Sequence, residues 1–229
     1  MSNTVSNVSA GKPKIGGAVF RAPVGTPLPT TASAELDAAF KDLGFVSDAG
    51  VTNSSGVTTN AVKSWGGDTV LTTQESRDDA FAMTLIESLN AEVLKAFHGD
   101  EGVSGELATG IVVKASGRDL GTHSYVIDMV MRDRAVKRIV IPNAMVSETG
   151  DVVYSDNDVV GYPLTLSAQP DADGNTHYEY IQRAAASSGD VSEEPALSVD
   201  ASEDAAPSVV TPEDATSSDG EPEDIGGGE

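Results

Sequence analysis

Three histidines are the residues of this chain best suited to catalysis or metal binding, and they lie far apart. His98, His123 and His177 are separated by dozens of residues, and none has another ligand type four positions away, as in an HExxH helix. We therefore expect no metal site. His98 is more simply explained as the end of a helix, where a cation suits the helix dipole.

His123, Ser124 and Asp128 include the three residue types of a serine-hydrolase triad, but the surrounding sequence does not support such a site. The sequence has no G-x-S-x-G elbow and no loop that would supply an oxyanion hole. We expect no catalytic residues and no enzymatic activity.

Two further patterns resemble binding motifs but lack essential parts. Asp171, Asp173 and Asn175 match the start of a calcium loop, yet the position that would supply a bidentate Glu is Gln182. The Gly16-Gly17 and Gly66-Gly67 pairs match neither phosphate-loop pattern. We expect a tight turn at 171–175, bends at the glycines, and no cofactor.

The charge of the chain is distributed unevenly. The net charge is −22, and all 14 Lys and Arg lie at or before Arg183. Residues 1–183 carry 23 Asp and Glu and a net charge of −9, whereas residues 184–229 carry 13 acids and no base. An acidic segment without aromatic residues buries too little apolar area to offset its ordering entropy, so we expect a disordered acidic extension at 184–229.

Composition also narrows the function classes. A net charge of −22 argues against binding DNA through its phosphates, because that mode of binding needs clusters of Lys or Arg. The chain has no Cys, and therefore no disulfide framework. No apolar run approaches the roughly 18 residues that a membrane span needs. The start is polar, without a secretory signal, so we expect a soluble protein made in a cytoplasm.

Most of the chain reads as short β-strands separated by turns. Expected strands cover 15–22, 68–74, 79–87, 111–115, 124–132, 136–141 (ended by Pro142), 152–154, 159–167 and 176–181. A hairpin turn is expected at Asp171–Asn175. We expect one helix at 90–98, capped by Ser88 or Asn90 and ended by Gly99. Repeated short strands favour a β-sandwich or barrel.

Two segments near the N-terminus are less regular. Leu36, Ala39, Phe40 and Leu43 recur at helical spacing, which predicts a short helix over 34–43 that plugs the body. Residues 47–62 are rich in Ser, Thr, Asn and Gly, and form either a mobile loop or a polar hairpin around Asn53–Gly56. Trp65 is the single Trp, and serves either as a core anchor or as an anchor at a subunit contact.

The order of these parts resembles the major tail proteins, or tail tube proteins, of long-tailed siphovirus-type bacteriophages. The resemblance rests on AVFRAPVGTPLPT (18–30), LDAAFKDLGFVSDAGVT (36–52), WGGD (65–68) and GYPLTLSAQPDADGNTHYEYI (161–181). It covers about residues 15–183, with 1–14 as a flexible N-terminal arm.

The resemblance implies a mainly β (α+β) tail-tube fold, a β-sandwich or barrel with a flanking α-helix. The strands would join a ring-wide inner barrel in stacked hexameric rings that conduct DNA into the host. Residues 15–31 would be an arm and 47–62 a loop that bridges rings. We expect Phe20, Leu28, Val51, Val57 and Trp65 in subunit contacts.

The implied partners are further copies of the chain and the tail terminator, tape measure and tail-tip proteins of the same virion, with assembly in the host cytoplasm. DNA would pass through the lumen without specific binding, and no membrane is involved. Two alternatives remain open. One is another ring-forming protein, such as a tail terminator or contractile inner tube, and the other is a monomeric surface-binding β domain.

Overall fold

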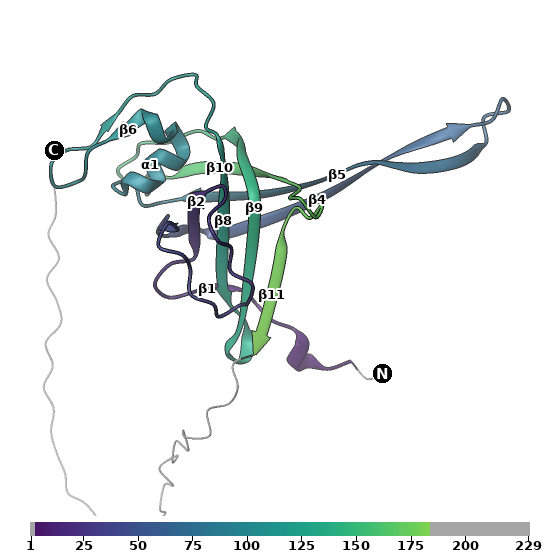
Figure 1. Ribbon diagram of the computed structural model, residues 1–229, viewed down its shortest axis with the longest axis horizontal. Coiled ribbons are helices and arrows are strands. Elements are labelled where there is room, and N and C mark those ends of the chain that lie inside the picture. The colour runs from purple at the N-terminus through teal and green to yellow at the C-terminus, as the bar shows by residue number, and fades with distance from the viewer. Residues whose placement is uncertain (1–2, 184–229) are drawn as a thin grey trace, which may run out of the picture. The chain divides into compact units, whose positions relative to one another are not determined.

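A nine-stranded antiparallel sheet forms the body of the protein (Figure 1). The structure is a computed structural model, and it describes residues 3–183. The main path through the sheet is β3-β2-β8-β9-β10-β5-β4, with β1 paired to β8 and β11 paired to β9. The strands are β1 (Lys12–Pro13), β2 (Val19–Pro23), β3 (Lys41–Asp42), β4 (Val46–Lys63), β5 (Thr69–Leu85), β8 (Thr122–Val130), β9 (Ala135–Thr149), β10 (Tyr162–Gln169) and β11 (Tyr178–Arg183).

Smaller elements complete the described chain. They are β6 (Val103–Ser104) paired with β7 (Val112–Val113), the 3-10 turns η1 (Val5–Asn7), η2 (Asp100–Gly102) and η3 (Arg132–Arg134), and the helix α1 (Ala91–His98). The expected mainly β fold with one flanking helix is confirmed. No helix within residues 3–183 has the length and apolarity needed to cross a bilayer.

The helix α1 forms where the sequence predicts it and covers one face of the sheet. Asn90 caps its start by accepting a hydrogen bond from the backbone N–H of Glu92, and Gly99 ends it at a positive φ of 90°. Val93, Leu94 and Ala96 are buried against sheet residues such as Tyr125, Phe81 and Leu164. This is the main hydrophobic core.

Strand β9 lies at the centre of the sheet. Strand β8 pairs with one of its edges, and β10 and β11 pair with successive parts of the other edge. Residues 143–149 of β9 pair with β10, and residues 135–140 pair with β11. The expected hairpin at Asp171–Asn175 is therefore wrong in its pairing, although the turn itself is present. That turn interrupts two strands that run in the same direction along β9.

Pro142 does not end its strand, contrary to expectation. It lies inside β9, where the pairing with β8 shifts register between His123 and Tyr125. A bulge is one of the few sheet positions that tolerate a residue without an N–H donor. Elsewhere, residues 152–154 form no strand, and the expected strand at 111–115 is reduced to Val112–Val113.

The segment 24–40 covers the opposite face of β2, β8 and β9 as an irregular chain, so the helix expected at 34–43 is wrong. Asp37 accepts hydrogen bonds from the backbone N–H groups of Ala39 (side chain) and Phe40 (carbonyl), which makes a local turn that competes with a helix. Arg138 donates to the carbonyls of Thr31 and Ala34 and holds this segment down.

The apolar residues of that segment have two destinations. Leu28, Leu36, Ala39 and Phe40 pack on a second cluster with Phe20, Ala22, Val126, Val140, Tyr178 and Tyr180, whereas Leu43 enters the main core. Their helical spacing therefore reflects a chain passing over the sheet edge, with side chains buried on both faces.

Residues 12 and 13, within the expected N-terminal arm, form a short strand. Residues 1–14 were expected as a loose arm, but Lys12 and Pro13 pair with Val130 and Met129 of β8. Residues 184–229, for which we expected a disordered extension, lie outside the described residues.

Candidate assembly surfaces

The longest exposed feature is the hairpin of β4 and β5. The strands pair from Val46–Leu85 to Lys63–Thr69, with register shifts at three places. Strand β10 pairs with β5 only between Asp79 and Leu85, so the hairpin beyond Asp78 extends past the body with no further strand beside it in the described chain (Figure 1). The turn expected at Asn53–Gly56 is wrong, because the chain reverses at Ser64–Asp68.

The outer edge of β4 is unpaired along its whole length within residues 3–183. Natural edge strands are usually short or protected by charges and prolines, because bare edges pair with other chains. The 18 residues of β4 contain one acid, Asp48, one base, Lys63, and no proline. This edge is therefore a template on which another strand can pair.

The hairpin is anchored at its base through Asp79, which is buried. Its carboxylate accepts a hydrogen bond from the Thr176 hydroxyl and lies 3.6 Å from Nδ1 of His177. Although burial raises the pKa of Asp79, hydrogen bonds from Ser55 and Thr176 and the charge of His177 lower it below its ordinary value. The hairpin base is thus fastened to the chain just before β11.

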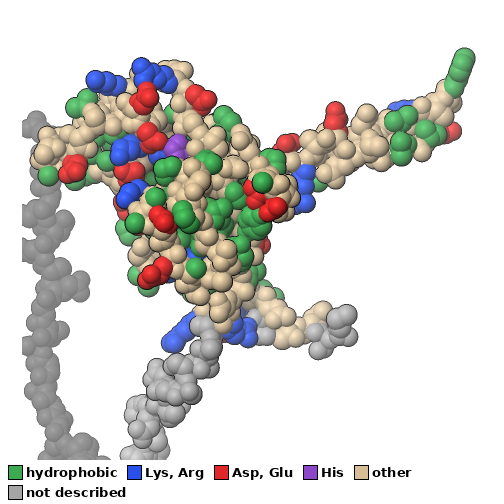
Figure 2. All heavy atoms as spheres, in the orientation of Figure 1, with side chains coloured by type: hydrophobic (Ala, Val, Ile, Leu, Met, Phe, Trp, Pro, Cys, Tyr) green, Lys and Arg blue, Asp and Glu red, His purple; other side chains and the backbone are tan. Residues whose placement is uncertain are grey.

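The projecting half of the hairpin carries apolar side chains in water. Trp65, at the turn, is fully exposed, and hydrophobic side chains are visible near the end of the hairpin (Figure 2). The other exposed apolar residues here are Val57, Val62, Val70 and Leu71. Trp65 is therefore no core anchor of its own subunit.

The five residues expected in subunit contacts fall into two groups. Val57 and Trp65 are exposed on the hairpin. Phe20 and Leu28 pack against the second cluster, and Val51 packs against the main core, each half-buried. Val62, Val70 and Leu71, which are close to Trp65 in sequence, are exposed on the same hairpin.

A second surface is the uncovered face of β10, β5 and the base of β4, opposite α1. Burial alternates strictly along β10 and along Asp79–Leu85 of β5, so one face is core and the other half-exposed. The half-exposed face carries small residues, with a shallow groove lined by Gly50, Thr52, Ala82, Thr84, Pro163 and Thr165 among others. Asp78 of β5 and Glu148 at the adjoining end of β9 add acidic side chains to this face.

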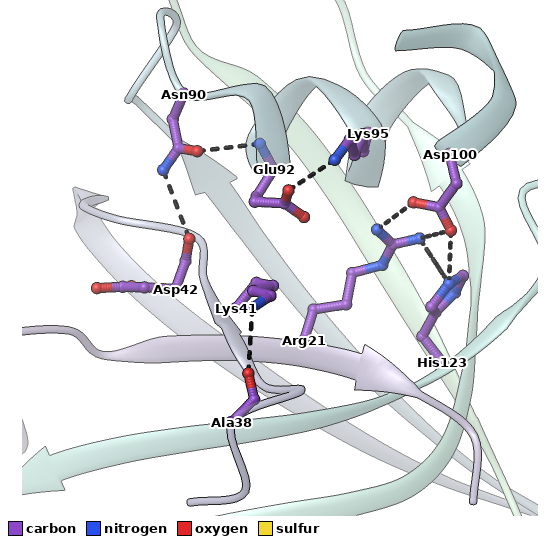
Figure 3. Close-up of polar contacts among 9 residues, drawn as sticks. All are labelled: Arg21, Ala38, Lys41, Asp42, Asn90, Glu92, Lys95, Asp100 and His123. Atoms are coloured by element: carbon purple, nitrogen blue, oxygen red, sulfur yellow. Dashed lines mark hydrogen bonds and ion pairs between the residues drawn. The ribbon is translucent and has the colours of Figure 1, made fainter. Parts of the chain in front are cut away.

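The group most like a catalytic site is Arg21, Asp100 and His123 (Figure 3). The guanidinium of Arg21 points from β2 to Asp100, with bonds of 2.8 and 3.0 Å. Its Nη2 also lies 2.7 Å from Nε2 of His123, and the same Nε2 is 3.0 Å from Asp100. The three residues join β2, η2 and β8, and so hold the end of α1 against the sheet.

The electrostatics of this cluster favour a neutral histidine beside an ion pair. Burial and the positive charge of Arg21 lower the pKa of His123, and Asp100 offsets only part of this effect. Partial burial raises the pKa of Asp100, but the hydrogen bonds and charges of Arg21 and His123 hold it below its ordinary value. The adjoining cavity, about 430 Å³, is bordered by Glu92 and Lys95, which pair with each other at 2.7 Å.

The remaining chemical motifs are separated or used internally. The Ser124 hydroxyl donates to the carbonyl of Pro142 (2.7 Å), and Asp128 pairs with Arg138, both on the face opposite His123. Asp171 accepts from the backbone N–H groups of Asp173 and Asn175 and from the Tyr178 hydroxyl, as a turn residue. Between residues 3 and 183, no cluster of three or more His, Asp or Glu is arranged to hold a metal.

The described chain thus combines a large antiparallel sheet, a long open strand edge and an exposed apolar hairpin. The family model of phage tail tube proteins matches residues 7–190. The chain belongs to this family, and its role is that of a structural component of a phage tail. A comparison with curated proteins finds no match to the chain.

Proposed function

We propose that this chain is the repeating subunit of a tail tube whose copies close into hexameric rings, and that the stacked rings conduct DNA into the host. The observation that carries this proposal is the open edge of β4, 18 residues long and nearly free of charge. Pairing of that edge with a neighbour satisfies backbone groups and converts separate sheets into one continuous barrel.

The face opposite α1 is the side we assign to the lumen. It is the uncovered face, and its small side chains leave the interior wide. Asp78 and Glu148 add negative charge, and no Lys or Arg lies on this face of β10 or of the hairpin base. Negative charge repels DNA phosphates, so DNA slides without binding.

We assign the contact between rings to the β4–β5 hairpin. The bridging segment is then residues 46–85 rather than 47–62. Its projecting half has two strand edges available to other subunits. Assembly occurs in the host cytoplasm, with the tail terminator, tape measure and tail-tip proteins as partners.

Electron microscopy of the purified chain, with and without residues 184–229, tests the proposal. We expect hollow tubes or discrete rings from both forms, and the images give the number of subunits in each ring. A sample that remains monomeric at every concentration, even when tail tips of the same phage are added, contradicts the proposal.

A second variant tests the open edge directly. Replacing Thr58 and Asn60 by Lys puts charge in the middle of β4, where it opposes strand pairing. These side chains are exposed, so we expect the unfolding free energy to change by less than about 0.5 kcal/mol. Tube formation should be lost, whereas Ser155→Lys with Asn157→Lys, on an exposed loop, should leave it intact.

A further inference from the structure

We propose that Trp65 at the tip of one subunit's hairpin inserts into a cavity at the hairpin base of a second copy. The cavity is lined by Ile15, Ala18, Phe45 and Val46, among others. This inference rests on the proposed function, because it describes one contact through which the subunits assemble.

The inserting residue is presented in a fixed turn. The backbone N–H of Ser64 donates to the carbonyl of Asp68 (2.8 Å), and that of Gly67 to the carbonyl of Ser64 (2.9 Å). Trp65 is fully exposed on this turn. An aromatic side chain removes roughly 150–250 Å² from water when it is buried, and Trp is enriched among the residues that dominate interfaces. A single exposed Trp at a hydrogen-bonded turn is therefore well placed as an anchor.

The receiving cavity measures about 410 Å³ and has mainly apolar walls. Ile15 and Phe45 are largely exposed beside it, at 98% and 72% of their accessible surface. The wall is held in place before any partner arrives. The backbone N–H of Phe45 donates to Glu87 (3.1 Å), and that of Gly44 donates to Asp42 (2.8 Å). A preformed apolar recess suits a rigid aromatic ring.

Charges on the two surfaces are complementary. Asp42, Glu87 and Lys14 are the charged residues that line the cavity, and Lys14 also contacts Asp128 at 3.4 Å. The tip carries Lys63 and Asp68 on either side of Trp65. Lys63 can therefore pair with Asp42 or Glu87 when the turn is inserted, and this charge complementarity favours the tip as the occupant.

The length of β4 rules out insertion of Trp65 into the cavity of its own chain, so the proposed contact is with a second copy. Val46 begins β4 at the cavity, and Trp65 follows the end of β4 at Lys63. A strand of this length spans about 60 Å at about 3.3 Å per residue, so Trp65 lies far from the cavity of its own chain. A contact between two different surfaces of one protein is head-to-tail, and its repetition gives a closed ring or an open helical stack. Both outcomes are compatible with a tube.

The single Trp provides a direct readout, because all indole fluorescence comes from Trp65. We expect emission to shift to shorter wavelength, and acrylamide quenching to fall, when the full-length chain assembles. Trp65→Ala should raise the concentration needed for assembly at least about tenfold. Leu107→Ala, at another exposed apolar position, should leave that concentration unchanged.

Cross-linking identifies the receiving surface, since the chain has no native Cys. Ser64→Cys marks the tip beside Trp65, and Ile15→Cys marks the cavity. A short bismaleimide should link a mixture of the two single variants into dimers, and should link the double variant into a ladder of oligomers. Each single variant alone, and Ser64→Cys mixed with Leu107→Cys, should stay unlinked.

The two experiments separate the inference from the proposed function. Tubes that form with unshifted Trp65 emission and without a Ser64–Ile15 cross-link overturn the docking and leave the tube role standing. Cross-linked pairs in a sample that makes no rings or tubes support the docking and contradict the tube role. A blue shift combined with links to Leu107→Cys places Trp65 elsewhere on the partner and overturns the assignment of the cavity.

Discussion

Arg138 and Asp128 form a two-point ion pair across β9 and β8, with N–O distances of 2.6 and 2.7 Å, and each side chain is only 1% exposed. Arg138 also donates to the carbonyls of Thr31 and Ala34. One side chain therefore joins two strands to the irregular segment that covers the second face of the sheet.

Removing that guanidinium should be strongly destabilising. Arg138→Met leaves Asp128 buried with only Lys14 nearby, at 3.4 Å, and the expected loss is about 3–5 kcal/mol of unfolding free energy. Urea denaturation measures it, and Arg118→Met is the matched control, since its pair with Glu101 is exposed and contributes at most about 1 kcal/mol. The double change Arg138→Met with Asp128→Leu should recover part of the loss. A loss below about 1 kcal/mol for Arg138→Met contradicts this role.

Acid should loosen the contact between α1 and the sheet at the cluster of Arg21, Asp100 and His123. The lowered pKa of His123 means that the unfolded chain takes up its proton first, so stability falls as pH drops below about 6.5. The pKa of Asp100 is also lower in the folded protein than in the unfolded chain. Asp100 therefore stabilises the fold at pH values above its unfolded pKa, and this stabilisation is lost as the pH falls through its folded pKa.

Thermal melts between pH 7.5 and pH 5.5 measure the histidine part of this effect. Wild type should lose melting temperature over that window, and His123→Gln should lose less. His98, the last residue of α1, also has its pKa lowered by burial, so His98→Gln measures its separate share of the pH dependence. Equal pH slopes for wild type and His123→Gln speak against the assignment to His123.

Gly44 should be far less replaceable than Gly25, although both have positive φ, 72° and 94°. A Cβ at Gly25 meets nothing within 4 Å, so Gly25→Ala costs about 1–2 kcal/mol of backbone strain. A Cβ at Gly44 meets the carboxylate of Glu87, which must then give up its bonds to Phe45 and Asn90. Each lost bond adds about 1 kcal/mol, and chemical denaturation of the two Ala variants measures the difference. Equal losses contradict the role of Glu87.

Positive charge on the face assigned to the lumen should impair DNA passage without preventing assembly. Asp78→Lys with Glu148→Lys changes exposed side chains on the uncovered face. Tubes should form normally, but virions that carry the change should eject DNA slowly, because Lys attracts phosphates. Matched changes on the other side of the molecule, such as Glu101→Lys with Glu106→Lys, should leave ejection unchanged. Normal ejection from the first variant excludes this face from the lumen.

The helix α1 was predictable because its signals are local. A cap at Asn90, a stop at Gly99 and an apolar stripe between them all lie within one stretch of chain. The segment 34–43 shows the opposite case. Its apolar spacing is helical, but Asp37 makes a turn and distant Arg138 binds its backbone, and neither effect can be read from periodicity.

The hairpin shows why strand partners are harder to predict than strands. The composition of residues 47–62 suggested a turn at Asn53–Gly56, yet that stretch is continuous strand opposite Asp78–Phe81. In the same way, β10 and β11 were expected to pair with each other, but both pair with β9. Register depends on partners far away in sequence, and polar strands specify it weakly.

The unpaired half of the β4–β5 hairpin has a consequence for when tubes form. A two-stranded ribbon is at best marginally stable in water, so much of its order is completed only against neighbours. If the chain assembles as proposed, the first few subunits to meet would bear that entropic cost with few contacts in return, whereas a subunit that joins a finished ring would gain its contacts at once. We therefore expect assembly to be limited by nucleation, so that a pool of folded subunits waits until a template starts growth.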